Sequence, residues 1–197
     1  MSILKTKSLN IYLGLALVTF LLSCTSFVRD ETGVPAEVVT YGSRYIIEKV
    51  GQSYFNEHFV YLPEYSFDIS PRGHRGGWYR ICWQYNVTDK PGMNSRVDLI
   101  VSSAGYRLDR GDIDGVPDCI MDISRCEYSV DKTRALEIAL ASGFDDGVDE
   151  WNLDFVWMSR KECYVWRFTK TKWICGVYRN KDVLAIDARN GEIYETD

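Results

Sequence analysis

The feature that most constrains the fold is a pattern that occurs twice, a helical segment followed by short runs of alternating apolar and polar residues. Apolar residues recur at helical spacing before Gly51 and again before Gly143. Each helical segment leads into strand-like runs, of which Trp78–Val87 and Tyr164–Phe168 are the clearest. Alternation places every second side chain on one face of a sheet, and a helix can cover that face. The sequence therefore predicts an α+β protein with helices packed on antiparallel sheets, in two repeated units.

The ends of the expected helices are marked by ordinary capping residues. The first helix should follow Pro35 and end at Gly51, and the second should run from an N-cap at Asp131 to Gly143. The expected strands, in chain order, are Tyr61–Ile69, Trp78–Val87, Val97–Val101, Leu153–Met158, Tyr164–Phe168, Trp173–Tyr178 and Val183–Ala188.

The two halves can be aligned on each other at a shift of about 85 residues. This shift pairs the apolar positions of two alternating runs, Tyr79, Ile81 and Trp83 with Tyr164, Trp166 and Phe168. A shift of 86 pairs Gly105 with Gly191, each placed after a strand where a tight turn needs positive φ. Two units are expected on this basis, residues 37–118 and 131–197. The alternative is chance alternation in a β-rich chain.

The first residues read as an export signal. Lys5 and Lys7 precede an apolar run, Leu9–Leu22, that is too short for a membrane span of about 20 residues. The run ends in LLSC, which resembles the lipobox of bacterial lipoproteins, in which the cysteine is diacylated and the signal before it is removed. We expect residues 1–23 to be the signal peptide, Cys24 to carry the lipid and 24–36 to be a tether. An ordinary signal and a transmembrane anchor are the alternatives.

Charge and composition limit the class of partner. Residues 1–23 contain two lysines and no acid, so the mature chain would carry 21 basic and 28 acidic residues. Such a balance repels phosphate, and we expect no nucleic-acid partner. The expected location is the bacterial cell envelope, with the membrane contacted through the lipid. Thr25 and Ser26 lack the aspartate that retains some lipoproteins in the inner membrane, which favours the outer membrane.

The cysteines suggest disulfide bonds. Five remain if one of six carries lipid, and an exported protein can keep its disulfides. Cys119 and Cys126 could close a small loop. Cys163 and Cys175 lie symmetrically about Thr169, as cross-strand neighbours in a hairpin would. The alternative is that these cysteines are small buried hydrophobic residues.

The remaining cysteine and the two histidines point to structure more than to chemistry. Cys82 has no symmetric partner and should be free. No CxxC motif occurs and His58 and His74 lie far from the cysteines, so zinc is not expected. The chain also lacks GxSxG, HExxH and phosphate-loop motifs, and we expect neither an enzyme nor a bound cofactor.

One acidic segment resembles a calcium loop. Asp112, Asp114 and Asp118 form DxDGxxD, in which alternate carboxylates can converge on a hard cation. The first and twelfth ligand positions of an EF-hand loop would hold Arg110 and Met121, which are not ligands. The alternatives are therefore a calcium site with a changed path and an acidic linker with an Asp-Gly turn.

The second half resembles the PepSY domain. TRALEIALASG matches its alanine-rich helix, and Asp187, Gly191 and Ile193 in DVLAIDARNGEIYE match its last strand. The first half carries Ser102 where an aspartate would be expected. The resemblance implies a non-catalytic exported module that binds or restrains a protein such as a peptidase. A helix followed by strands is also similar to the cystatin-like and NTF2-like families, including immunity proteins, so a periplasmic protein that neutralises a toxin is the alternative function.

The alternating runs also predict a partner surface. The face with Tyr79 and Tyr164 should pack under the helices, so Trp78, Arg80 and Arg167 should point to the other side. Val165 and Cys82 should point the same way. Tryptophan and arginine are typical of protein-binding hot spots, and we expect these three residues to contact a protein partner. The alternative is that the two units cover each other's sheets.

Overall fold

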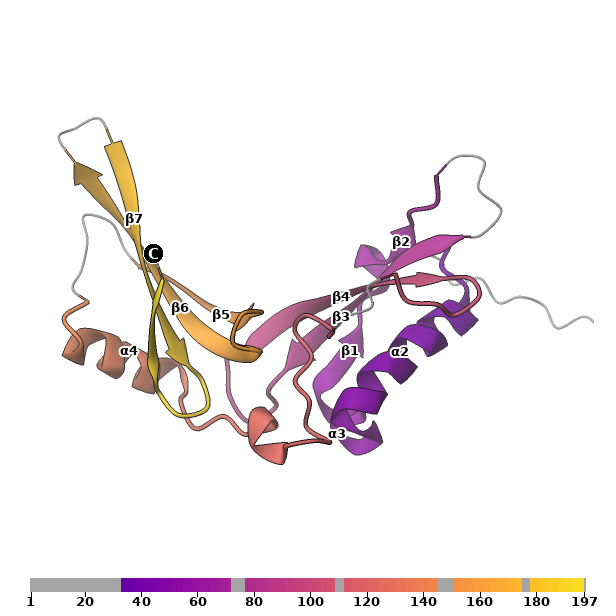
Figure 1. The fold of residues 1–197 in the computed structure, drawn as a ribbon, viewed down its shortest axis with the longest axis horizontal. Helices are drawn as coiled ribbons and strands as arrows, with labels where there is room; N and C mark the ends of the chain where they lie inside the picture. Colours follow the sequence, from indigo (N-terminus) through magenta and orange to yellow (C-terminus); the bar gives the residue numbers. More distant parts are fainter. Residues whose placement is uncertain (1–32, 72–76, 109–111, 145–150, 175–177, 197) are drawn as a thin grey trace, which may run out of the picture.

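The computed structural model describes residues 33–71, 77–108, 112–144, 151–174 and 178–196. This part holds three α-helices and two four-stranded antiparallel sheets, so the chain is an α+β protein, as the sequence predicts. The sheets splay apart from the middle of the molecule (Figure 1). No helix in these ranges is long and apolar enough to cross a membrane. The signal segment and Cys24 lie outside the described residues.

Helix α2 (Ala36–Val50) lies against one face of the first sheet. It follows Pro35 and ends at Gly51, as predicted, because a glycine at φ +84° cannot continue the helix. Its buried residues are Val38, Gly42, Ile46 and Val50. A Cβ on Gly42 would lie 2.5 Å from the Trp83 ring, so only a glycine lets the helix approach the sheet this closely.

The first sheet is built around one long strand. Its strands are β1 (Phe59–Tyr61), β2 (Phe67–Asp68), β3 (Trp78–Asn86) and β4 (Asn94–Ser102). Strand β4 pairs with β3 along its whole length, and β1 and β2 share the other edge of β3. A short helix that the sequence did not predict, α3 (Gln52–His58), connects α2 to β1.

The predicted strand Tyr61–Ile69 is interrupted by a 3-10 turn, η1 (Pro63–Tyr65). Proline has no N–H to give to a β-ladder, and the chain leaves β3 at this point. The Leu62 N–H donates to the carbonyl of Cys82 at 2.9 Å, and the Ser66 hydroxyl accepts the N–H of Cys82 at 3.0 Å. A side chain thereby replaces the missing strand partner, which satisfies the buried backbone of β3.

The second unit also consists of a helix and an antiparallel sheet. Helix α4 (Lys132–Ala141) begins after Asp131, whose carboxylate accepts the Arg134 N–H at 2.8 Å, so the predicted N-cap is confirmed. The predicted turn at Gly143 is confirmed by its φ of +81°. The strands β5 (Asn152–Met158), β6 (Cys163–Ile174), β7 (Tyr178–Asp187) and β8 (Ile193–Thr196) pair in that order.

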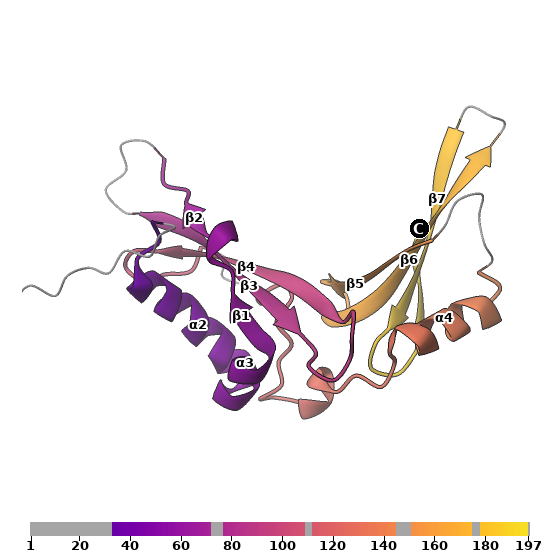
Figure 2. The ribbon, with the colours of Figure 1, turned by 180° about the vertical axis from the view of Figure 1, so that it is seen from behind.

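Strands β6 and β7 continue beyond their neighbours. The last residue of β6 paired with β5 is Thr169, and the last residue of β7 paired with β8 is Val183. Beyond these two residues β6 and β7 pair only with each other, as a two-stranded ribbon (Figures 1 and 2). The prediction of a separate strand at Trp173–Tyr178 is wrong, because this segment contains the ends of β6 and β7.

One hydrophobic core runs through both units on the helix side of the sheets. The alternating positions predicted to face inward are buried, namely Tyr79, Ile81, Trp83, Tyr85, Tyr164, Trp166 and Phe168. The rings of Tyr85 and Tyr164 stack with centroids 5.1 Å apart, which joins the two sheets. Tyr128, from the segment between the units, packs edge-on against Tyr164.

Candidate protein-binding face

The face of the first sheet opposite α2 holds the residues predicted to point outward from β3. These are Trp78, Arg80, Cys82 and Gln84, opposite Ser102, Ile100, Asp98 and Arg96 of β4. Arg80 is exposed and Trp78 is half-buried. Both predicted partner-binding residues of this strand are therefore accessible.

Large apolar side chains gather on this face. Among the described residues eleven large hydrophobic side chains are exposed, and five of them belong here: Val60, Tyr65, Phe67, Tyr106 and Leu108. Register brings two of them to the face, because Val60 lies opposite Gln84 and Phe67 lies opposite Arg80.

Tyr106 and Leu108 lie on the same face because the chain after β4 turns back and forms a β-bridge with that strand. Val101 pairs with Arg107, and the Leu108 N–H donates to the Ile100 carbonyl at 3.0 Å. Neighbours of a bridged pair point to the opposite side from the pair itself. Since Val101 faces the core, Tyr106 and Leu108 lie on the face opposite α2.

Two arginines stack on aromatic rings of this surface. The Arg80 guanidinium lies 5.8 Å from the centroid of Phe67, and that of Arg96 lies 5.5 Å from the centroid of Tyr65. We call this surface the aromatic-arginine face, defined by Val60, Tyr65, Phe67, Trp78, Arg80, Arg96, Tyr106 and Leu108. Exposed rings that hold arginines in place are typical of protein-binding hot spots.

Sequence reasoning identified only Trp78 and Arg80 of this surface. Tyr65 and Phe67 lie in the run Tyr61–Ile69, which was read as one strand, and Tyr106 was not singled out. Their proximity depends on pairing with β3 and β4, which no local pattern encodes.

Cys82 lies on the same side of the sheet but is closed off from solvent. Its thiol donates to the Asp98 carboxylate at 2.6 Å and lies 3.0 Å from the Tyr65 carbonyl. Burial, together with the Asp98 carboxylate, raises the pKa of this thiol to about 12. Cys82 is free, as predicted, and is a poor nucleophile at neutral pH.

The second sheet differs on its side opposite the helix. Arg167 is exposed, as predicted, and lies 3.6 Å from the Asp154 carboxylate. Val165 lies on this side, as predicted, but it is only 1% exposed because other apolar side chains cover it. It belongs to a small apolar cluster formed by Cys163, Val165 and Ala185 with Val156, Met158 and Tyr194.

A buried ion pair lies next to this cluster. The fully buried Asp187 accepts the Arg189 guanidinium at 2.6 Å, the Arg189 N–H at 2.8 Å and the Tyr194 hydroxyl at 2.9 Å. Burial alone would raise the pKa of Asp187, but the hydrogen bonds from Arg189 and Tyr194 lower it below its ordinary value. Burial next to Asp187 raises the pKa of Cys163 to about 11.

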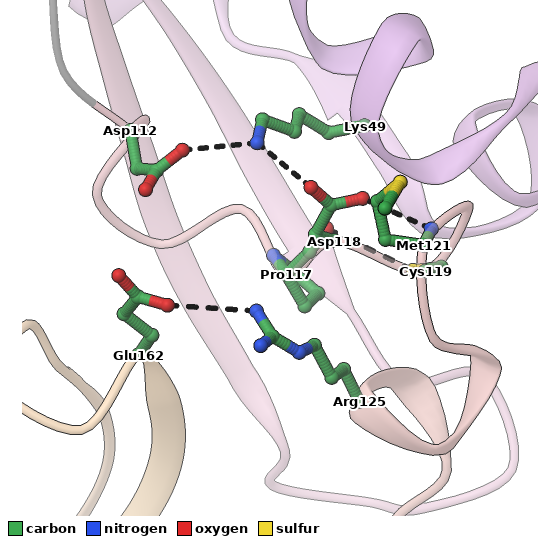
Figure 3. Close-up of polar contacts among 8 residues, drawn as sticks. All are labelled: Lys49, Asp112, Pro117, Asp118, Cys119, Met121, Arg125 and Glu162. Carbon is green, nitrogen blue, oxygen red and sulfur yellow. Dashed lines mark hydrogen bonds and ion pairs between the residues drawn. The ribbon is translucent and has the colours of Figure 1, made fainter.

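The predicted calcium loop is held by a lysine (Figure 3). The Lys49 ammonium lies 2.9 Å from Asp112 and 2.8 Å from Asp118. These hydrogen bonds raise the pKa of Lys49. At Asp118 desolvation acts to raise the pKa, but the bond from Lys49 outweighs it and the pKa is lowered.

This arrangement does not support the calcium prediction. The ammonium of Lys49 takes the place between two carboxylates that a metal ion would need. Asp114 is exposed and, with Asp112, lines a cleft of about 490 Å³ between the units. Within the described ranges no three histidine, cysteine, aspartate or glutamate residues are grouped to hold a metal ion.

The segment between the units is cross-linked. Cys119 and Cys126 form a disulfide with Cα atoms 5.6 Å apart, which confirms the predicted pair. The bond closes a loop containing a 3-10 turn, η2 (Ile123–Cys126). Arg125 in this loop lies 3.5 Å from Glu162 in the β5–β6 turn (Figure 3). The linker is thus fastened to α2 through Lys49 and to the second sheet through Arg125.

The predicted pairing of Cys163 with Cys175 depended on a hairpin centred on Thr169, and that hairpin is absent. Residues Cys163–Ile174 form one continuous strand, whose ends lie roughly 36 Å apart. A disulfide needs Cα atoms within about 7 Å. Cys163 is a free buried thiol, and Cys175 lies outside the described residues.

His58 is held as a structural residue, as predicted. Its Nδ1 lies 2.9 Å from the Asn86 carbonyl and 3.1 Å from the Thr88 hydroxyl. The ring packs on Tyr54 with centroids 4.0 Å apart. His74 lies outside the described residues.

Comparison with known proteins assigns no relative to this arrangement. No protein-family model, no curated protein and no solved structure matches the chain. Its function must be inferred from its own side chains.

Proposed function

We propose that the chain is a lipid-anchored, non-catalytic binding protein of the bacterial cell envelope that captures a protein partner on the aromatic-arginine face. The observation that carries this proposal is the gathering of five exposed large apolar side chains and two ring-stacked arginines on one face of one sheet. Large apolar side chains exposed together on one face mark an interaction site, whereas apolar residues exposed singly do not.

Anchoring is supported by the sequence before the folded part. The LLSC motif ends at Cys24, and nine residues separate this cysteine from Val34, which is buried in the core. A tether of that length leaves the domain free to turn at the membrane surface. The Cys24→Ala protein should remain a precursor or a soluble exported form. If it still stays with membranes after a high-salt wash, and the wild type takes up no labelled fatty acid, the anchor is disproved.

A non-catalytic role is supported by the state of the candidate nucleophiles. Cys82 and Cys163 are buried, and the pKa values of their thiols are raised to about 12 and about 11. Catalytic cysteines need the opposite shift. The Nδ1 atom of His58 is within hydrogen-bond distance of the Asn86 carbonyl and the Thr88 hydroxyl.

We further propose that the two units are repeats of one PepSY-like module. Both contain a helix, then strands, then a glycine turn after the last long strand, with φ +82° at Gly105 and +81° at Gly191. The bridge between Val101 and Arg107 has its counterpart, about 86 positions later, in the pairing of Ile186 with Ile193.

The test is capture of the envelope partner by variants of the face. Lipidated protein carrying a photo-cross-linker at Phe67 should trap a defined protein in its own envelope, and Trp78→Ala with Arg80→Ala should reduce the yield at least tenfold without a fall in Tm. Arg44→Ala is the matched control, because Arg44 is also exposed and stacked on a ring, that of Tyr41, but on the helix side.

The identity of the trapped protein separates the two candidate functions. A peptidase supports restraint of proteolysis, and a secreted toxin supports immunity. A fall in Tm by several degrees for the Trp78 and Arg80 variant, with no specific cross-link, would show that this surface serves folding and would remove the proposal.

A further inference from the structure

The cleft of about 490 Å³ lies where the two units meet. Its walls include Asp98 of β4, Arg107 of the segment that bridges back to β4, Asp114 of the linker, and Trp157 and Ser159 at the end of β5. Figure 1 shows β4 and β5 approaching each other in the middle of the molecule. Ligand sites of proteins commonly have this size and lie at such junctions.

The edge of β4 that borders the cleft is only partly covered. The Ile100 carbonyl accepts the Leu108 N–H at 3.0 Å, so Ile100 directs its backbone groups away from β3. Alternate residues of an antiparallel strand direct their backbone groups to the same edge, and the N–H and C=O of Asp98 therefore point outward as well. In the described part of the chain, no backbone group beyond this edge is bonded to them.

The open part of this edge is short and centred on Asp98. On one side the chain around Leu108 covers the edge, through its bond to Ile100. On the other side the linker comes close, since a Cβ on Gly115 would lie 3.9 Å from the Arg96 carbonyl oxygen. An unpaired strand edge is a template for another extended chain, and here it is framed by the walls of a cleft.

Side chains of both charges line the cleft, two arginines and three aspartates. Several of them are already engaged, because Arg96 lies 3.4 Å from Asp98 and Lys49 lies 2.9 Å from Asp112. Asp114 is exposed and forms no ion pair with any residue that the structure describes. It is therefore the carboxylate of the cleft that is available to a cationic group.

A second unsatisfied group belongs to Trp157. Its ring forms part of the cleft wall and packs edge-on against Tyr164, with centroids 5.2 Å apart. The indole N–H is buried and, within the described ranges, has no hydrogen-bond partner. A buried donor without an acceptor is unfavourable, so a carbonyl oxygen brought to this ring from the cleft would stabilise it.

We propose that the cleft binds a short extended peptide, which pairs with the edge of β4 at Asp98 and places a basic side chain at Asp114. A peptide backbone supplies both the acceptors and the donors that this edge and the Trp157 indole lack. The proposal goes beyond the proposed function and does not rest on it, because the aromatic-arginine face is the flat side of the sheet and only Arg96 borders both sites.

The experiment is calorimetric titration of residues 24–197 carrying Cys24→Ala with a blocked pentapeptide of alternating valine and lysine. Alternate amides of an extended peptide face opposite edges. N-methylation of either the valine amides or the lysine amides should therefore weaken binding about tenfold, whereas methylation of the other set should change it less than about threefold. Hydrogen exchange should show the Asp98 amide protected by the unmethylated peptide.

Two sets of variants locate the peptide. Ser159→Trp should fill the cleft and abolish binding, and Ser103→Trp is the matched control, because Ser103 is an exposed serine outside the cleft. Asp114→Asn should weaken binding about threefold, but should not weaken binding of the same peptide with glutamine in place of lysine. Trp78→Ala with Arg80→Ala should leave the affinity unchanged, which separates this site from partner capture.

Four results would overturn the proposal. They are no binding at millimolar peptide, equal binding of both methylated peptides and the parent, a loss in Ser159→Trp no larger than in Ser103→Trp, and loss of peptide binding in the Trp78 and Arg80 variant. If Ser159→Trp lowers the Tm, exchange at Asp98 in the unaltered protein decides, and an amide that the peptide does not protect removes the proposal.

Discussion

The two units share a plan but use the side of the sheet opposite the helix differently. In the first unit this side is exposed, and the rings of Tyr65 and Phe67 hold Arg96 and Arg80 in place. In the second unit the centre of the same side is closed by an apolar cluster around Val165, beside a buried ion pair. A sheet face without a helix is therefore accessible to a partner only where the sheet's own side chains leave it open.

The difference extends to charge. The first unit stacks its arginines on exposed rings, whereas the second buries one carboxylate, Asp187, against Arg189. In the first unit the Arg80 guanidinium is exposed and Arg96 pairs only with Asp98, at 3.4 Å and partly exposed, whereas in the second unit the Arg189 N–H groups bond to a buried carboxylate. The second unit also extends into the two-stranded ribbon of β6 and β7, which has no counterpart among the described strands of the first unit.

The largest expected effect tests whether the two units are one folding unit. Trp83→Ala and Trp166→Ala should each lower the free energy of unfolding by about 4 kcal/mol, because each removes a fully buried ring from the continuous core. Trp166→Phe should cost about 1 kcal/mol more than Trp83→Phe, because the Trp166 indole N–H donates to the Val130 carbonyl at 2.9 Å. Denaturant unfolding should show one transition for each variant. Two separate transitions would mean that the units fold independently.

The next effect compares equivalent positions of the two units. Asp187→Asn should cost about 3 kcal/mol, because it leaves Arg189 charged and without its carboxylate. Ser102→Ala, about 85 positions earlier, should cost about 1 kcal/mol through the lost bond from the Tyr106 N–H. The double variant Asp187→Asn with Arg189→Met should recover part of the lost free energy of unfolding. If the losses of the two single variants simply add up in the double variant, the pairing is contradicted.

This pair also predicts a pH dependence. The pKa of Asp187 is lowered in the folded state, below the unfolded value of about 3.9. Its contribution to stability is therefore complete above the unfolded pKa and is lost as pH falls through the folded pKa. Thermal unfolding should show the wild type and Asp187→Asn converging below about pH 4. A gap that widens on acidification would be inconsistent with this sign.

A smaller effect is expected in the linker. Cys119→Ala with Cys126→Ala should cost about 2.5 kcal/mol, the value for a loop of this length. The wild type in reductant should unfold at the same denaturant concentration as the double variant. Since the loop is fastened to both units, the transition should stay single. A reductant effect that persists in the double variant would show that another cysteine pair is bonded.

The smallest effect concerns the carboxylates of the linker. Lys49→Gln should cost about 0.5–1 kcal/mol, because the ion pairs with Asp112 and Asp118 are partly exposed. Arg125→Gln should cost less, since Arg125 has one ion pair, with Glu162 at 3.5 Å, and both of these side chains are more exposed than Lys49 and Asp118. Calcium should leave the Tm of the wild type unchanged in calorimetry. A calcium-dependent rise in Tm would restore the calcium-site interpretation.

Local patterns predicted much of each unit. The alternation in Trp78–Val87 and Tyr164–Phe168 identified the two central strands and their buried faces, because strand geometry alone sends alternate side chains to opposite sides. Asp131 and Gly143 marked α4 for an equally local reason, the unsatisfied backbone groups at helix ends. The Cys119–Cys126 pair was also found from spacing.

Two features were left undecided or misread for the same reason. Val165 and Arg167 lie on the same face of one strand, as predicted, and only tertiary packing decides that the first is buried and the second exposed. Symmetry about Thr169 suggested a hairpin, whereas pairing with β5 and β7 holds Cys163–Ile174 as one strand. In both cases the local sequence pattern was compatible with two structures, and long-range contacts decided between them.

The sequence by itself thus determined which residues form helices and strands and which side of each strand is apolar, since both follow from the geometry of neighbouring residues. Only the tertiary structure decided which apolar side chains stay exposed, and it placed Lys49 between Asp112 and Asp118, more than 60 positions away. It likewise assembled the aromatic-arginine face from β1, β2 with the turn before it, β3, β4 and the segment that bridges back to β4. The physical reason is that burial depends on what the rest of the chain brings to a side chain, and no local pattern specifies that.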